Sequence, residues 1–118
     1  MKKSNYCVLK IYASSTDKIR SQLLYEYIVN LAKEKNLSGV TVYRGIMGYG
    51  LSSKKISSSK FWELTEKLPI MIEIVDKNKI LDKFYKIIKQ ELIDMPKGCL
   101  VTIEPVKIKL LKSGDKIE

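Results

Sequence analysis

The sequence has no histidine and only two cysteines among its 118 residues. Without histidine, the commonest acid–base catalyst and zinc ligand of proteins is missing. Cys7 and Cys99 lie far apart in the sequence, so they lack the paired spacing of a zinc or iron–sulfur site, and two cysteines do not make a disulfide framework. We therefore predict two free, buried thiols, and we expect neither a metal nor a cofactor.

Long apolar runs are also missing. No segment approaches the roughly 20 apolar residues that a membrane helix needs. Residues 1–5 lead directly into a strand-like run, without the hydrophobic stretch of a signal peptide. These features favour a cytoplasmic protein.

Basic residues are plentiful, because 22 lysines and arginines outnumber 13 acidic residues and give a formal net charge of +9. This excess favours anionic partners such as nucleotides, nucleic acid or an acidic protein surface. The lysines are spread along the chain, so we expect most of them to solvate exposed faces. With 45% hydrophobic residues, the chain is predicted to fold as one domain spanning residues 1–118.

Two periodicities in the apolar residues predict the fold. Spacing of three and four predicts one helix before the second strand and another before the last strand. Alternation of apolar and polar residues predicts strands over residues 6–12, 40–43, 68–75 and 99–104. The order βαββαβ predicts an α+β, ferredoxin-like sandwich, with a four-stranded antiparallel sheet and both helices on one face.

Polar segments are expected to begin the helices and to separate the strands. Residues 14–17 and Asp76 supply side-chain oxygens suited to capping the two helices. Residues 51–60 contain five serines and three lysines, and we interpret them as a flexible loop. Residues 111–118 are expected to form a C-terminal tail.

The sheet face away from the helices is predicted to be apolar. An apolar face of this size is unusual on a monomer, so it indicates self-association. The alternative is that these are scattered surface residues without a partner. The side chains predicted on this face are Val8, Tyr12, Tyr43, Met71, Val75 and Leu100.

The most unusual segment, Arg44–Gly50, has three glycines in six residues where a strand ends. Glycines let backbone amides converge on an anion, and the planar guanidinium of Arg44 suits phosphate or carboxylate. The structural alternative is a β-bulge that leads into a loop. A second basic turn, Lys97-Gly98, is first of all a helix stop signal, but it is also a candidate to approach the glycine segment of a neighbouring subunit.

Three runs of the sequence resemble a known family: residues 24–29 (LYEYIV), 37–50 (LSGVTVYRGIMGYG) and 68–76 (LPIMIEIVD). Their order and spacing match across residues 6–108, and the arginine-glycine-isoleucine run that ends in glycine-tyrosine-glycine is the most specific part. The chain is therefore similar to the PII-like family known as domain of unknown function 190, which is related to the nitrogen-regulatory PII signal proteins.

The resemblance implies a non-enzymatic signalling protein. Its fold would assemble as a homotrimer that holds a small anionic ligand, such as an adenine nucleotide, in clefts between subunits. By position, the ligand-binding residues would be Arg44, Gly45, Gly48, Tyr49, Gly50, Lys97 and Gly98. No catalytic residue is assigned.

The resemblance also implies that the loop after the glycine segment contacts the protein being regulated, and a membrane transport protein is the implied target. The loop residues are Ser52, Ser53, Lys54, Lys55 and Ser57. The uridylylated tyrosine of true PII loops has no counterpart within residues 51–60, so control by that modification is not expected.

Two other functions share this order of elements. An acylphosphatase-like hydrolase needs an asparagine beside the arginine cradle, but Asn30, Asn36 and Asn78 lie in or next to predicted helices, away from Arg44. An RNA-binding module needs aromatic residues on the third strand, where this chain has residues 70–74 (IMIEI) without a ring. We therefore expect no enzyme activity and no nucleic acid partner.

Overall fold

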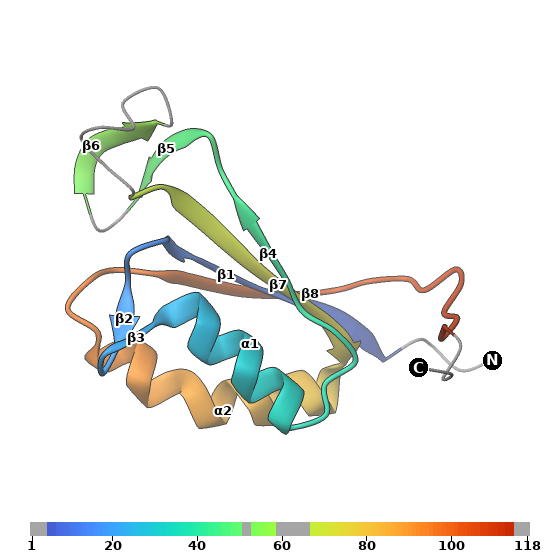
Figure 1. Ribbon diagram of the computed structural model, residues 1–118. Helices are drawn as coiled ribbons and strands as arrows, with labels where there is room; N and C mark the ends of the chain where they lie inside the picture. Colours follow the sequence, from blue (N-terminus) through green and yellow to red (C-terminus); the bar gives the residue numbers. More distant parts are fainter. Residues whose placement is uncertain (1–4, 51–52, 59–66, 115–118) are drawn as a thin grey trace.

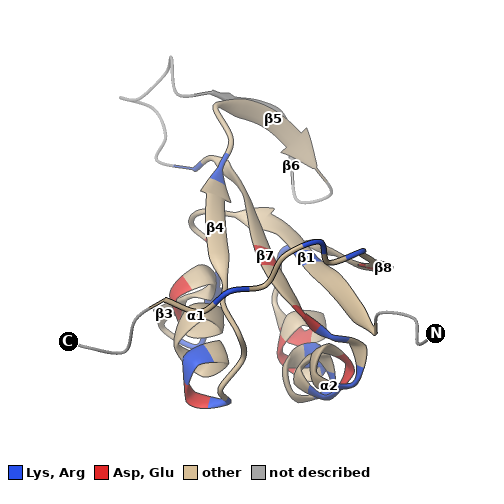
Figure 2. Ribbon diagram, turned by 90° about the vertical axis from the view of Figure 1, so that its right-hand side faces the viewer, with Lys and Arg blue, Asp and Glu red and all other residues tan. Residues whose placement is uncertain are grey.

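The computed structural model (Figure 1) describes residues 5–50, 53–58 and 67–114. Its main sheet has four antiparallel strands, and two helices cover one face of this sheet (Figure 1). Seen from the end of the sheet, the helices lie side by side beneath it (Figure 2). In spatial order the strands are β4 (Thr41–Arg44), β7 (Pro69–Lys77), β1 (Tyr6–Ser14) and β8 (Leu100–Pro105), and the helices are α1 (Leu24–Glu34) and α2 (Asn78–Asp94). This arrangement confirms the predicted ferredoxin-like fold.

The sheet face toward the helices carries the core. Antiparallel pairing sets Ile11 of β1 opposite Ile72 of β7 and Val101 of β8, so alternate residues of these strands share one face. Each fully buried aliphatic side chain contributes about 1.5–3 kcal/mol, which draws the helices onto the sheet. The buried side chains of α2 are Leu81, Phe84, Ile88 and Leu92.

The first helix begins later than predicted. Residues 14–17 do not cap it, because the short strands β2 (Lys18–Ile19) and β3 (Gln22–Leu23) come first, and α1 begins at Leu24 without a side-chain cap. The carboxylate of Asp17 instead accepts the N–H of Ser14 at 2.9 Å. Aspartate often bonds its own local backbone in this way, so here it closes the turn at the end of β1.

Asp76 does not cap the second helix either. It belongs to β7, is buried, and accepts the N–H groups of Ser38 at 2.8 Å and of Lys77 at 2.7 Å. Its carboxylate therefore ties the chain before β4 to the end of β7. Among the described residues, no helix is both long and apolar enough to cross a bilayer.

Part of the predicted loop is a strand. Residues Ser53–Ser58 form β6, which pairs antiparallel with β5 (Met47–Gly50) in a ribbon on the side of the sheet away from the helices (Figure 1). Residues 51–52 and 59–60 of the predicted loop lie outside the described residues. A ribbon held by backbone hydrogen bonds does not need the apolar alternation of a core strand, which is why the polar sequence suggested a loop.

Both cysteines are free thiols, as predicted. Each is half-buried rather than buried, which corrects the prediction. In the antiparallel pair of β1 and β8, Cys7 lies opposite Pro105, whereas Cys99 precedes Leu100 at the other end of the pairing. The two thiols therefore lie at opposite ends of the sheet.

Candidate functional site

A cleft of about 480 Å³ opens at the end of the sheet where β1 ends and where β7 and β8 begin. Strand β5 of the ribbon forms another wall. Small-molecule sites commonly have volumes of about 300–1,000 Å³, so the cleft has the size of a ligand site. It is lined by Tyr12, Ala13, Ser14, Gly48, Tyr49, Gly50, Lys67, Leu68, Pro69, Ile70, Gly98, Cys99 and Leu100.

Close packing on Pro69 positions the β5 wall. The N–H of Gly45 donates to the carbonyl oxygen of Pro69 at 2.7 Å. A Cβ on Gly45 would lie 3.0 Å from Cγ of Pro69, and a Cβ on Gly48 would lie 3.4 Å from the same atom. The pairing of β5 with β6 also shifts register between Gly48 and Gly50. Two of the three glycines are thus explained by packing and an irregular strand, which is the structural alternative raised above.

Two hydrogen bonds hold the floor of the cleft. The N–H of Ser15 donates to the carbonyl oxygen of Leu68 at 2.8 Å, and the N–H of Leu68 donates to Oγ of Ser15 at 2.9 Å. They fasten the chain just before β7 to the chain just after β1. The strand ends that line the cleft are therefore held together without a ligand.

The walls of the cleft are mainly apolar side chains and glycine backbone. Lys67 is the only basic residue among the described residues that line it. Behind one wall lies the buried carboxylate of Asp17, which is bonded to Ser14. Burial, together with the charge of Asp17, raises the pKa of the Cys99 thiol, so this thiol stays protonated near neutral pH and is not an activated nucleophile.

The structure places four of the predicted ligand residues in this cleft. Gly48, Tyr49, Gly50 and Gly98 line it together, within a single chain. The other three, Arg44, Gly45 and Lys97, are not among the lining residues.

Arg44 is exposed at the end of β4, opposite Ile70, and Gly45 contacts Pro69 as described. Lys97 is exposed in the turn that precedes Gly98. The only basic side chains predicted to bind the ligand thus lie outside the cleft of one chain.

The predicted target-binding residues lie mostly on the ribbon. Ser53, Lys54, Lys55 and Ser57 belong to β6, and Ser52 lies outside the described residues. The ribbon continues directly from the cleft wall, because Gly48 and Gly50 both line the cleft and pair with β6. One short segment therefore joins the candidate ligand site to the candidate target surface.

Sequence reasoning missed several lining residues. Tyr12, Leu68 and Cys99 come from three strand ends that are far apart in the sequence, and no local motif marks any of them. Only the register of the sheet brings them together, since Tyr12 pairs with Leu100 and Ser14 pairs with Pro69. No signal in the sequence could have identified them without that register.

The sheet face away from the helices carries the predicted apolar side chains, but Val8 is buried, with 5% of its surface exposed, which corrects its place in an exposed face. The register sets Tyr12 opposite Met71 and Leu100, and Met71 opposite Tyr43. Tyr12, Tyr43 and Leu100 are 39%, 47% and 50% exposed. The hydroxyl of Tyr43 donates to Oε1 of Glu73 at 2.9 Å, and this hydrogen bond raises the pKa of Tyr43.

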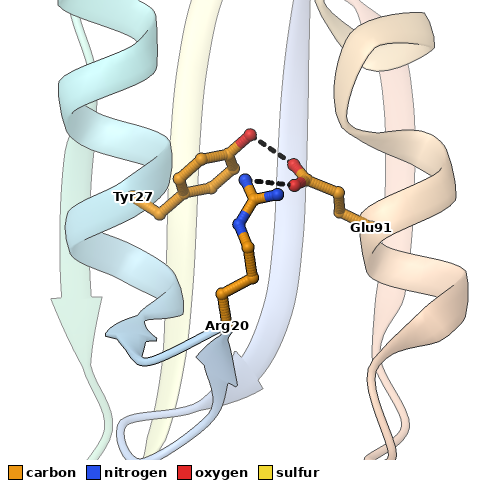
Figure 3. Close-up of polar contacts among 3 residues, drawn as sticks. All are labelled: Arg20, Tyr27 and Glu91. Carbon is orange, nitrogen blue, oxygen red and sulfur yellow. Dashed lines mark hydrogen bonds and ion pairs between the residues drawn. The ribbon is translucent and has the colours of Figure 1, made fainter.

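A polar contact links the two helices on the opposite side of the molecule (Figure 3). Arg20, in the turn between β2 and β3 with φ of 53°, forms an ion pair of 2.6 Å with Glu91 of α2. The hydroxyl of Tyr27 of α1 donates to the same carboxylate, and the Arg20 guanidinium lies 5.8 Å from the centre of the Tyr27 ring. Burial, followed by the contact with Glu91, raises the pKa of Tyr27.

The four-stranded antiparallel sheet with two helices on one face is a fold also found in solved structures of PII-like proteins. CPII, a nitrogen regulatory PII-like protein from Thiomonas intermedia K12, has the same fold, with a TM-score of 0.53 at 13% identity for its structure bound to ADP, AMP and bicarbonate. That match covers 89% of this chain and 96% of CPII. A structure of CPII bound to ADP and bicarbonate gives a TM-score of 0.52, covering 86% of this chain and 90% of that one, also at 13% identity.

The chain belongs to the DUF190 family, described as "Uncharacterized ACR, COG1993", whose model matches residues 6–108. The UPF0166 protein MJ1524 of Methanocaldococcus jannaschii is 36% identical over 98 residues, which are 80% of this chain and 89% of that protein. A UPF0166 protein of Aquifex aeolicus is 33% identical over 101 residues, covering 86% of this chain and 90% of its own length.

Proposed function

We propose that this chain is a non-enzymatic PII-like regulatory protein that binds a small anionic ligand, an adenine nucleotide, and presents its β5–β6 ribbon to a target protein. The observation that carries the proposal is the cleft, which gathers Gly48, Tyr49, Gly50 and Gly98 beside the ribbon. We place the protein in the cytoplasm, where its free thiols would stay reduced.

The lining of the cleft suits the base of a nucleotide better than its phosphates. Tyr12 and Tyr49 supply rings, glycine backbone permits close approach, and apolar side chains make up most of the rest. The anionic part would then lie toward the cations around the cleft, namely Lys67, Arg44 and Lys97. The ligands of CPII, which are ADP, AMP and bicarbonate, support this choice of class.

The apolar sheet face supports assembly of three copies into a homotrimer. Tyr12 and Leu100 belong both to this face and to the cleft, so a copy that covers the face would also close the cleft. The ligand site would then be completed between subunits. Met71→Lys adds a charge between Tyr12 and Tyr43 on this face, and light scattering should then detect monomers in place of trimers.

The ribbon is proposed as the surface that contacts the target, a membrane transport protein. Ligand binding would favour one position of the ribbon only if the ligand makes better contacts with the ribbon in that position than in others. Gly48 and Tyr49 provide such contacts, because they belong to both the cleft and the ribbon. Binding of the target should therefore depend on the nucleotide.

Isothermal titration calorimetry of the purified chain tests the ligand, with ADP, AMP, ATP, cyclic nucleotides, bicarbonate and fluoride as probes. Tyr49→Ala should weaken adenine nucleotide binding about 5- to 150-fold, the range expected when a base loses an aromatic partner. Tyr49→Phe should retain most of the affinity. Arg44→Ala should weaken ATP more than AMP, because it removes a cation from the anionic end.

Ile46→Ala is the matched control, since Ile46 is 76% exposed in the same segment and does not line the cleft. Its affinity should equal that of the parent. A parent protein that binds none of the probes would contradict the proposal. If only RNA oligonucleotides stabilised the chain against unfolding, an RNA-binding module would be favoured. If the chain hydrolysed acyl phosphates, a hydrolase would be favoured.

A further inference from the structure

The end of the molecule opposite the ribbon carries a basic tail, defined as residues 106–112 (VKIKLLK). The tail leaves β8 and projects from the body at the end where β1 begins and β8 ends (Figure 1). Its base is anchored, because the N–H of Val106 donates to the carbonyl oxygen of Tyr6 at 3.1 Å. Beyond this anchor the tail has no helix or strand.

Side chains along the tail separate into two kinds. Val106 and Ile108 are half-buried, whereas the lysines at 107, 109 and 112 are exposed. Leu110 and Leu111 follow with exposures of 82% and 64%. Two adjacent leucines are thus exposed to solvent between Lys109 and Lys112.

Further lysines extend the positive charge of this end. Lys77 ends β7 opposite Tyr6, whose carbonyl anchors the tail, and Lys79 is exposed in the first turn of α2. Figure 2 looks directly at this end and shows basic segments on the tail and where β7 meets α2. The basic end is defined as Lys77, Lys79, Lys107, Lys109 and Lys112.

Among the residues that the structure describes, no acidic side chain is paired with a lysine of the tail. Asp76 is buried and already bonded to backbone, and Glu104 is the exposed acid of β8. The positive charge is therefore available to an external anionic surface.

We propose that the basic end binds an anionic lipid surface, with the tail lysines at the headgroups and the two leucines inserted at the boundary with the acyl chains. Near such a surface each lysine strengthens binding about fivefold. Binding to such a surface strengthens with the apolar area that is buried and with the attraction between basic side chains and anionic lipids. This inference concerns a surface remote from the cleft and does not depend on the proposed ligand.

Other occupants explain the tail less well. Nucleic acid would contact the lysines but would leave both leucines in water, and the tail has no ring to stack on a base. Two copies meeting through their basic ends would repel one another, because each end carries the same five exposed lysines. An anionic membrane satisfies both the charge and the apolar side chains.

Vesicle flotation of the full chain tests the proposal. The parent should bind vesicles of phosphatidylglycerol mixed with phosphatidylcholine, should ignore pure phosphatidylcholine, and should dissociate at high salt. Replacing Lys107, Lys109 and Lys112 together with glutamine should weaken binding about 100-fold, the product of three single effects. The double variant Leu110→Ser, Leu111→Ser should weaken it about 100-fold or more, because two leucines lose their apolar burial.

The matched control replaces Lys18, Lys86 and Lys89, three exposed lysines away from the tail, with glutamine. It should bind vesicles like the parent, although its net charge falls equally. If the control lost as much vesicle binding as the tail-lysine variant, or if the leucine variant bound as well as the parent, the attraction would be non-specific charge attraction and the proposal would be overturned. The proposal would also be overturned if the parent did not bind the anionic vesicles and the tail variants instead formed smaller assemblies by light scattering or no longer bound RNA.

Discussion

Replacing Gly45 by alanine tests how the cleft wall is positioned. The new methyl group would lie 3.0 Å from Cγ and 3.4 Å from the carbonyl oxygen of Pro69. Carbon atoms in contact prefer about 3.5–4.0 Å, so β5 or Pro69 must shift by several tenths of an ångström. Overpacking of this kind costs about 1–3 kcal/mol. Gly50→Ala is the control, because nothing lies within 4 Å of the added Cβ.

Thermal and urea unfolding measure the effect. For a chain of this length, a loss of 1 kcal/mol lowers Tm by about 3–6 °C, so Gly45→Ala should melt several degrees below both the parent and Gly50→Ala. Pro69→Ala removes the γ-carbon, so the double variant should lose less stability than the sum of the single variants. Equal stability of the two glycine variants, or strict additivity with Pro69→Ala, would refute the packing argument.

Two further predictions concern groups with raised pKa values. Below its ordinary pKa of 10.0, Tyr27 is protonated in both the folded and the unfolded state, and its hydrogen bond to Glu91 is intact. Because folding raises this pKa, that stabilisation should fade as the pH rises above 10.0. Tyr27→Phe should therefore cost about 1–2 kcal/mol at neutral pH, and it should abolish the alkaline loss of stability when unfolding is measured as a function of pH. Cys99 lines the cleft and Cys7 does not. An adenine nucleotide at 100 times its Kd should therefore slow maleimide labelling of Cys99 about 100-fold and leave the labelling of Cys7 unchanged, as measured by peptide mass spectrometry. Protection of Cys7 without protection of Cys99 would exclude binding in this cleft.

Alternation and helical spacing were enough to predict the order of elements and the two faces of the sheet. Ile11 and Ile72 face the helices, and Tyr12 and Met71 face away, as the period of two requires. Such patterns are local, because each residue's burial depends on its own place in a strand or helix. The ends of the elements depend on particular hydrogen bonds, and for this reason the roles of Asp17 and Asp76 were predicted wrongly.

The sequence by itself determined the fold class, the family and the segment from Arg44 to Gly50 as a place of interest. Only the tertiary structure decided that Gly45 is small because Pro69 lies against it. It also decided that the cleft is built from strand ends separated by up to about ninety residues of chain, since β1 and β8 become neighbours only through long-range pairing. Contacts of that kind leave no local pattern, because the partners meet in space and not along the chain.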